Sequence, residues 1–75
     1  QFDSTKKPHE LLSNREFEIF HLLASGKTSS QIAEALSLAV TTISTHRNHI
    51  LEKMRLTNNS ELIRYAIAHH IISDI

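Results

Sequence analysis

Several residue types are absent or scarce in this 75-residue chain, and each absence excludes a class of protein. There is no cysteine, which excludes disulfides, zinc–thiolate sites and a cysteine nucleophile. One glycine and one proline in the whole chain argue against a turn-rich β fold. No apolar run approaches the roughly 20 residues that a membrane-spanning helix needs, and no signal peptide is recognisable. We therefore expect one small, soluble, intracellular domain with no membrane partner.

The charge of the chain is balanced rather than basic. Lys plus Arg and Asp plus Glu number eight each, so only the six histidines are left to alter the net charge. A nucleic-acid-binding domain usually carries a basic surplus, and the composition by itself therefore gives no support to that function.

The first residues differ from the rest of the chain because they have no hydrophobic periodicity. The stretch "QFDSTKKPHE" fits neither a helix nor a strand pattern, and the chain begins with Gln rather than Met. We expect residues 1–10 to be the end of an interdomain linker in a longer protein, and residues 11–75 to form the domain.

Two helix starts are marked by capping boxes, in which two side chains three residues apart bond each other's backbone N–H. "SNRE" places one start at Ser13, and Gly26 follows the last periodic residue, where a left-handed C-cap needs no Cβ. "TSSQ" places the next start at Thr28, with room for about two turns. A link this short favours the steep crossing of a helix-turn-helix.

The stretch "LAVTTISTHRN" at residues 38–48 opens a third helix, which we expect to span about residues 40–54. At about 100° per residue, Ile43, Ile50 and Met54 form a narrow apolar seam. The opposite side carries short polar groups and one acid: Thr41, Thr45, Asn48 and Glu52, with Ser44 and His49 at its edges. Solvated helices prefer Lys and Glu, which favour helix more. This face therefore indicates a surface that another molecule approaches closely.

A fourth helix is predicted to start near Asn58, whose side chain can cap it, with Glu61 three residues on. Its apolar side is split into two stripes: Leu62, Tyr65, Ala66 and His69 in the first, Ile63 and Ile67 in the second. Two stripes exceed what a small core requires. Either both isoleucines belong to the core, or they form a contact surface.

The joint spacing of these features over residues 12–72 resembles the C-terminal DNA-binding domain of the LuxR/FixJ (GerE-type) bacterial transcription regulators. The matching positions are Leu12, Arg15–Glu16, Glu18, Leu23–Ala24, Gly26, Ile32–Ala33, Leu36, Leu38, Thr42–Ile43, His46, Ile50, Lys53–Met54, Glu61–Leu62 and Tyr65–Ala66. The resemblance implies an all-α fold, a compact four-helix bundle whose second and third helices form the helix-turn-helix. It implies that the third helix enters the major groove of double-stranded DNA.

The same resemblance implies the partners of the chain. The fourth helix would form a homodimer, and a missing N-terminal domain would be a phosphorylated receiver, as in a two-component response regulator, or a ligand sensor. The resemblance also implies that the protein contacts RNA polymerase and that it lies in the bacterial cytoplasm, at the nucleoid.

The family's functional positions can be carried over residue by residue. Base contacts would come from Ser44, Thr45 and Asn48, with Thr41 near the helix start. Phosphate contacts would come from Lys27, Thr28, Ser29, Thr42, His46, Arg47 and Lys53. The dimer surface would comprise Ile63, Arg64, Ile67 and Ala68. Structural alternatives stay open, since Thr28 can be a cap alone, Arg47 can cover the core with its stem, and His46 can pack at the core edge.

The sequence departs from the family pattern at five positions. The family often has Asn, Lys, Lys, Ser and Gly where this chain has, in the same order, Ser29, Ser30, Ser44, Ala39 and His70. Phe17 occupies a position that is usually solvent-exposed in the family. It is either a surface aromatic or part of a contact with the missing domain. The loss of two typical lysines predicts weak DNA binding by the isolated domain with a shallow salt dependence. Dimerisation would offset this weakness.

A second function class stays open, a helical protein-interaction module that kept the fold and lost DNA binding. The neutral charge favours it, and the polar face of the third helix disfavours it, because that face lacks the large anchors of protein interfaces. No enzyme, metal site or cofactor is indicated, since no carboxylate joins His46 and His49 at a familiar ligand spacing.

Overall fold

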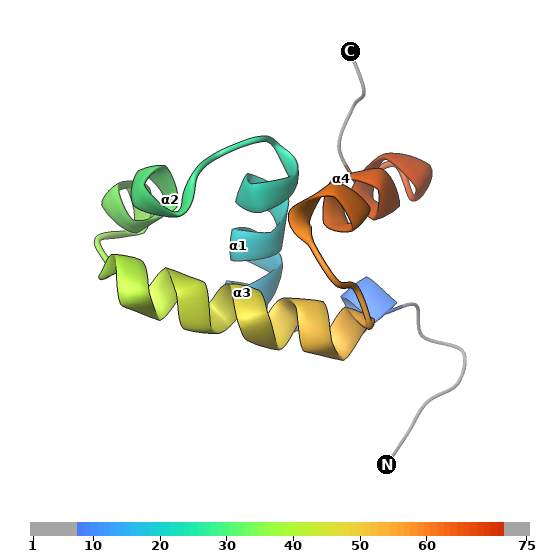
Figure 1. The fold of residues 1–75 in the computed structure, drawn as a ribbon, viewed down its shortest axis with the longest axis horizontal. Helices are drawn as coiled ribbons and strands as arrows, with labels where there is room; N and C mark the ends of the chain where they lie inside the picture. Colours follow the sequence, from blue (N-terminus) through green and yellow to red (C-terminus); the bar gives the residue numbers. More distant parts are fainter. Residues whose placement is uncertain (1–7, 72–75) are drawn as a thin grey trace.

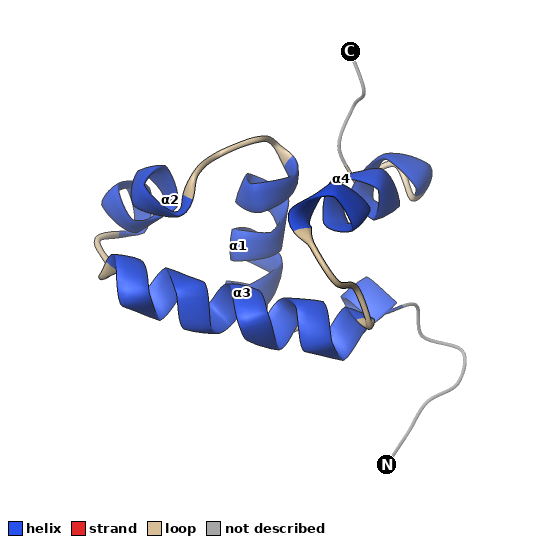
Figure 2. Cartoon of the chain, viewed as in Figure 1, coloured by secondary structure: helices blue, strands red, loops and turns tan. Residues whose placement is uncertain are grey.

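Four α-helices and one short 3-10 helix make up the computed structural model over residues 8–71, the part of the chain that it describes, and no strand occurs there (Figures 1 and 2). The elements are η1 (Pro8–Leu11), α1 (Asn14–Ala24), α2 (Ser29–Leu36), α3 (Val40–Met54) and α4 (Asn59–Ala68). The predicted all-α fold and the predicted span of the third helix are confirmed. The expected division of the chain at residue 10 stays a prediction, and η1 spans that position.

Helix α3 runs along one side of the molecule, and the other three helices lie on its other side (Figure 1). Helix α2 lies over the start of α3 and packs against it, while α1 packs against α2, α3 and α4. Residues 37–39 form the turn between α2 and α3. One side of α3 consequently faces away from the body of the domain.

The first two α-helices begin as the capping boxes predict. The Ser13 hydroxyl accepts the Glu16 backbone N–H at 3.2 Å, and the Glu16 carboxylate accepts the Ser13 N–H at 2.9 Å. Thr28 and Gln31 form the same reciprocal pair, at 3.1 and 2.9 Å. Two backbone donors at each helix start are thereby satisfied.

Helix α4 begins with a variant of this arrangement. The Asn58 side chain accepts the Glu61 N–H at 2.9 Å, as predicted. The Glu61 carboxylate reaches one residue further back and accepts from the N–H and the hydroxyl of Thr57, at 2.8 and 2.9 Å. These hydrogen bonds favour the charged carboxylate and therefore lower the pKa of Glu61.

Left-handed residues end the helices, and three of them carry side chains. Gly26 follows α1 with φ +94°, as predicted. Ser37 ends α2 and Arg55 ends α3, with φ of 57° and 58°, and His70 follows the end of α4 with φ 59°. Each non-glycine residue in this region costs roughly 1–2 kcal/mol. At the other end of α3, Ala39 provides no side-chain cap, as the sequence predicts.

A single hydrophobic core unites the four α-helices. Its largest fully buried side chains are Phe20, Ile19, Ile32, Ile43, Ile50 and Leu62. Helix α3 contributes more to it than the predicted narrow seam, because Leu51 is also buried, at 8% exposure. The seam prediction is therefore correct in direction and too narrow in width.

Glu16 is the buried charged residue of the part of the chain that is described. Its carboxylate accepts a hydrogen bond from Lys53 Nζ at 2.7 Å, an ion pair that ties the start of α1 to the last turn of α3. The Lys53 ammonium, and next the backbone N–H of Ser13, hold the pKa of Glu16 below its usual value. The pair spans 37 positions of sequence, and no local pattern predicted it.

Rings from η1, α1 and α4 form an aromatic cluster beside the core. The His9 N–H and Nδ1 lie 3.3 and 2.8 Å from the Tyr65 hydroxyl, and His69 stacks on Tyr65 with 4.1 Å between ring centroids. Burial raises the pKa of Tyr65. Phe17 packs against the core and lies near the His9 and Phe20 rings. Its side chain is half-buried, which corrects the alternative of a surface aromatic, and the alternative of a contact with the missing domain stays a prediction.

Candidate nucleic-acid interface

The outward side of α3 carries the residues predicted to read bases. Thr41, Thr45 and Asn48 are exposed, and Ser44 is half-buried at the edge of the same side. The core contacts of α3 are made by Ile43, Ile50, Leu51 and Met54 instead. A partner that approaches this side meets hydroxyl and carboxamide groups without having to displace another helix.

The hydrogen-bonding capacity of this side is only partly used within the domain. Thr45 Oγ1 donates to the Thr41 carbonyl at 3.0 Å, which leaves its lone pairs free to accept. The Asn48 amide has no hydrogen-bond partner among the residues described, so its donors and its acceptor both remain available. Val40, which the sequence analysis did not single out, adds an apolar group at the start of the helix with 46% exposure.

Helix α2 packs against α3, and the start of α2 offers a second set of polar groups (Figure 1). Thr28 and Lys27 are exposed, and Ser29 and Thr42 are half-buried. The Thr28 hydroxyl accepts a hydrogen bond as the cap of α2, and its own hydrogen remains free to donate. The capping alternative for Thr28 is thus real, and it is compatible with a phosphate contact.

The arginine and the lysine of α3 both have partners within the domain. Arg47 is half-buried and donates to the Asn59 side chain at 3.2 Å, at the start of α4. Lys53 is paired with Glu16. His46 is half-buried, and its Nδ1 is buried with no hydrogen-bond partner among the residues described, which fits the core-edge alternative. Lys27 is the predicted phosphate ligand with an exposed charge and no partner within residues 8–71.

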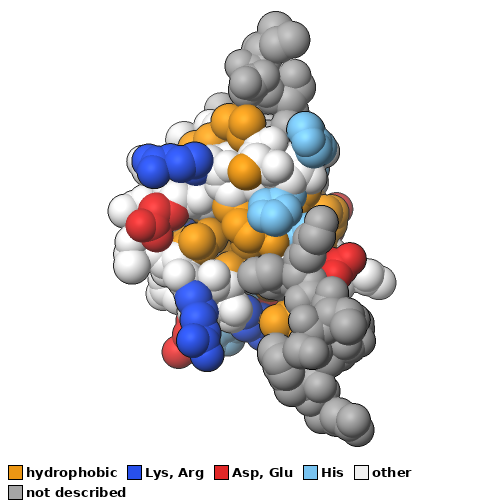
Figure 3. Space-filling view, turned by 90° about the vertical axis from the view of Figure 1, so that its right-hand side faces the viewer, with side chains coloured by type: hydrophobic (Ala, Val, Ile, Leu, Met, Phe, Trp, Pro, Cys, Tyr) orange, Lys and Arg blue, Asp and Glu red, His pale blue; other side chains and the backbone are white. Residues whose placement is uncertain are grey.

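The second apolar stripe of α4 lies outside the core. Ile63 and Ile67 are half-buried and belong neither to the core cluster nor to the partly buried residues packed against it. The alternative that both are core residues is therefore wrong. Arg64 and Ala68 are exposed on the same helix. Figure 3 looks onto the end of the domain where α4 lies, and apolar side chains gather there with histidines beside them.

Two searches of the described residues bear on other kinds of site. Within residues 8–71, no three His, Cys, Asp or Glu side chains lie close enough together to hold a metal ion. None of the helices described there has the length and apolar character needed to cross a membrane.

The fold and the outward side of α3 together define a class of protein. Two helices joined by a short turn, with short polar side chains exposed on the second of them, are the features of a helix-turn-helix module that binds nucleic acid. The chain belongs to the luxR family of bacterial regulatory proteins, whose sequence profile matches residues 10–66. Family and fold together identify it as a DNA-binding domain of transcription regulation, and they confirm the resemblance drawn from the sequence.

Individual relatives agree with this assignment. The chain is 42% identical over 65 residues to the oxygen regulatory protein NreC of Staphylococcus carnosus, covering 87% of this chain and 30% of that protein. It is 38% identical over 66 residues to the transcriptional regulatory protein LiaR of Bacillus subtilis, covering 88% of this chain and 31% of that protein. The chain thus spans less than a third of the length of these relatives.

Proposed function

We propose that the domain binds double-stranded DNA sequence-specifically by placing α3 in the major groove. The observation that carries this proposal is the exposed row of Thr41, Thr45 and Asn48 on a helix whose other side is in the core. An Asn carboxamide can form two hydrogen bonds with an adenine edge, and Thr can bond a base or touch the methyl group of thymine. Ser44, at the edge of this row, would contribute a further hydroxyl.

Phosphate contacts would hold the helix in register. Lys27, the Thr28 hydroxyl and the backbone N–H groups at Ser29 stand at the start of α2, where a helix terminus favours an anion. Thr42 and His46 would reach phosphates from α3, and Arg47 and Lys53 would do so only by sharing or leaving their partners Asn59 and Glu16. This engagement of cations within the domain supports the expectation of weak binding and a shallow salt dependence.

The active unit would be a homodimer that pairs through α4. Ile63 and Ile67 supply apolar area that the core does not use, and Arg64 and Ala68 border it. Two linked domains would bind two half-sites with much higher affinity than one domain alone. In the full-length protein an N-terminal receiver or ligand-sensing domain would control this pairing, and RNA polymerase would be a further partner, in the bacterial cytoplasm at the nucleoid.

The test is selection of binding sites from a random duplex library, followed by fluorescence anisotropy at two salt concentrations. We expect the wild-type domain to select a sequence and the double variant T45A/N48A to lose that selection, with at least a tenfold loss of affinity for the selected site, because each good base contact contributes roughly 1–3 kcal/mol. Asn14→Ala, which removes an exposed carboxamide from α1, is the control and should leave selection unchanged.

The opposite result would favour the protein-interaction module. If no duplex is bound saturably at low salt and high protein concentration, the polar row of α3 does not bind the major groove of DNA. The neutral net charge of the chain would then be the better guide to its function.

A further inference from the structure

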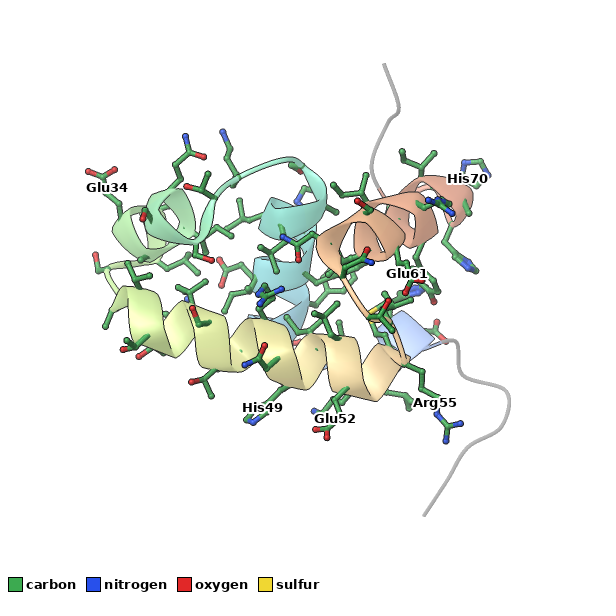
Figure 4. All side chains as sticks on the ribbon, in the orientation of Figure 1. Glu34, His49, Glu52, Arg55, Glu61 and His70 are labelled. Atoms are coloured by element: carbon green, nitrogen blue, oxygen red, sulfur yellow. The ribbon has the colours of Figure 1, made fainter. Side chains whose placement is uncertain are left out.

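The row of exposed side chains on α3 does not stop at Asn48. Glu52 lies four residues further on and seven after Thr45, which at 100° per residue places it within roughly 20–40° of both. Glu52 is exposed, and Figure 4 shows its side chain and that of His49 projecting from the side of α3 that faces away from the other helices. The rise of about 1.5 Å per residue places Glu52 roughly 10 Å beyond Thr45 along the helix, a distance within the width of a major groove.

The carboxylate of Glu52 is not used by the domain. Three other glutamates accept hydrogen bonds from a neighbour: Glu16 from Lys53, Glu18 from Arg15, and Glu61 from Thr57. Glu52 has no hydrogen bond or ion pair within residues 8–71, although it shares a helix with Lys53 and Arg55. Packing or internal pairing therefore does not account for an acid at this position.

A carboxylate on a DNA-facing row has few favourable partners. It can only accept hydrogen bonds, and the donors that base pairs present in the major groove are the amino groups of cytosine and adenine. The guanine and thymine edges present acceptors at the corresponding positions, and the phosphates are negative, so all of these repel it. Such a residue lowers affinity where acceptors or phosphates stand opposite, and it favours a sequence that presents an amino group there.

We propose that Glu52 is a further specificity-determining residue, which accepts a hydrogen bond from the amino group of a cytosine at the far end of the half-site read by α3. The proposal rests on the proposed function. The proposed role of Glu52 also explains part of the neutral net charge of the domain, because one negative charge on the DNA-facing side discriminates against non-cognate duplex.

The experiment compares wild type, E52Q and E34Q in site selection and in anisotropy with selected and scrambled duplexes. Glu34→Gln is a matched control, because Glu34 is also exposed, has no ion pair within the described range, and points from the far end of α2 away from the outward side of α3 (Figure 4). Both variants change the net charge equally. Circular dichroism checks that both remain folded, which is expected for exposed residues.

We expect E52Q to lose the preference for cytosine at one position, by about tenfold in relative affinity, and to gain preference for adenine there, since Gln pairs with an adenine edge. Affinity for scrambled duplex should rise in E52Q, and E34Q should match wild type in base preference. An E52Q protein that binds every duplex more tightly with unchanged preference, or that behaves as wild type, would overturn the proposal while the proposed function stands. A wild-type domain that selects no sequence would overturn both.

Discussion

The ion pair between Glu16 and Lys53 is the most direct test of how this small domain is held together. We consider Glu16→Gln, which keeps an amide oxygen for the Ser13 N–H and removes the charge that Lys53 Nζ meets at 2.7 Å. Glu16→Ala also removes the acceptor of the Ser13 N–H, which is half of the capping box, while the Ser13 cap itself remains. The matched control is Glu18→Gln, which breaks an i, i+3 pair with Arg15 whose two side chains are 48% and 51% exposed.

The magnitudes follow from exposure. The Glu16 side chain is 9% exposed and that of Lys53 44%, so the pair lies between a buried and a solvated one. Exposed pairs contribute roughly 0.2–1 kcal/mol and hydrogen bonds to charged groups roughly 1.5–3 kcal/mol, which places the loss in E16Q at about 1–2 kcal/mol. Losing the hydrogen bond to the Ser13 N–H costs about another 1 kcal/mol in E16A. A domain of this size has roughly 4–11 kcal/mol of stability in total, and E18Q should change it by less than about 0.5 kcal/mol.

Urea unfolding followed by circular dichroism gives the free energy of unfolding of each variant. A double-mutant cycle with Lys53→Met should give a coupling energy of at least about 0.5 kcal/mol. The pKa of Glu16 is lowered in the folded protein, so its contribution is complete above the unfolded value and is lost as the pH falls through the lowered folded value. E16Q should therefore lose less stability than wild type on acidification below about pH 4.5. A coupling near zero, or equal acid sensitivity of wild type and E16Q, would refute the reasoning.

Three further outcomes are expected. Ala39→Ser adds the missing cap to α3, because Ala39 has the extended backbone of a capping residue, with φ of −74° and ψ of 148°. This substitution should raise the free energy of unfolding by about 1 kcal/mol, and an unchanged urea midpoint would contradict the expectation. His70→Gly relieves a left-handed φ of 59° and should raise the melting temperature by about 4–8 °C, whereas a lower value would show that the His70 side chain makes a favourable contact. Ile67→Asp should leave the helix content unchanged and abolish a dimer detected by analytical ultracentrifugation on specific DNA; persistence of that dimer would remove α4 as the pairing surface.

Much of the secondary structure could be predicted from the sequence because its signals are local. The caps at Ser13, Thr28 and Asn58 each depend on residues three positions apart, and the C-cap at Gly26 depends on one residue type. The left-handed residues Ser37 and Arg55 were not predicted. Serine and arginine do not signal positive φ, because neither residue type favours the left-handed region as glycine does.

The tertiary contacts were harder to predict from the sequence. Glu16 was identified as half of a capping box, yet its burial and its bond to Lys53 depend on how α1 crosses α3, which no spacing in the sequence specifies. The exposed row of α3 was predictable because helical periodicity sorts the outward residues from the inward ones. The role of Ile63 and Ile67 was left open for the opposite reason, since periodicity cannot tell core from interface when both are apolar.

The bond between His9 and Tyr65 has a consequence for the boundaries of the folding unit. It joins positions 56 apart, so the segment ahead of the first long helix rests on the last one. A version of the protein trimmed to begin at Leu11 would expose the faces of Tyr65 and Phe17 that His9 now covers, and the final helix would be the first part to loosen. A force applied to the chain ahead of His9 would likewise act first on α4, the helix most distant from it in sequence.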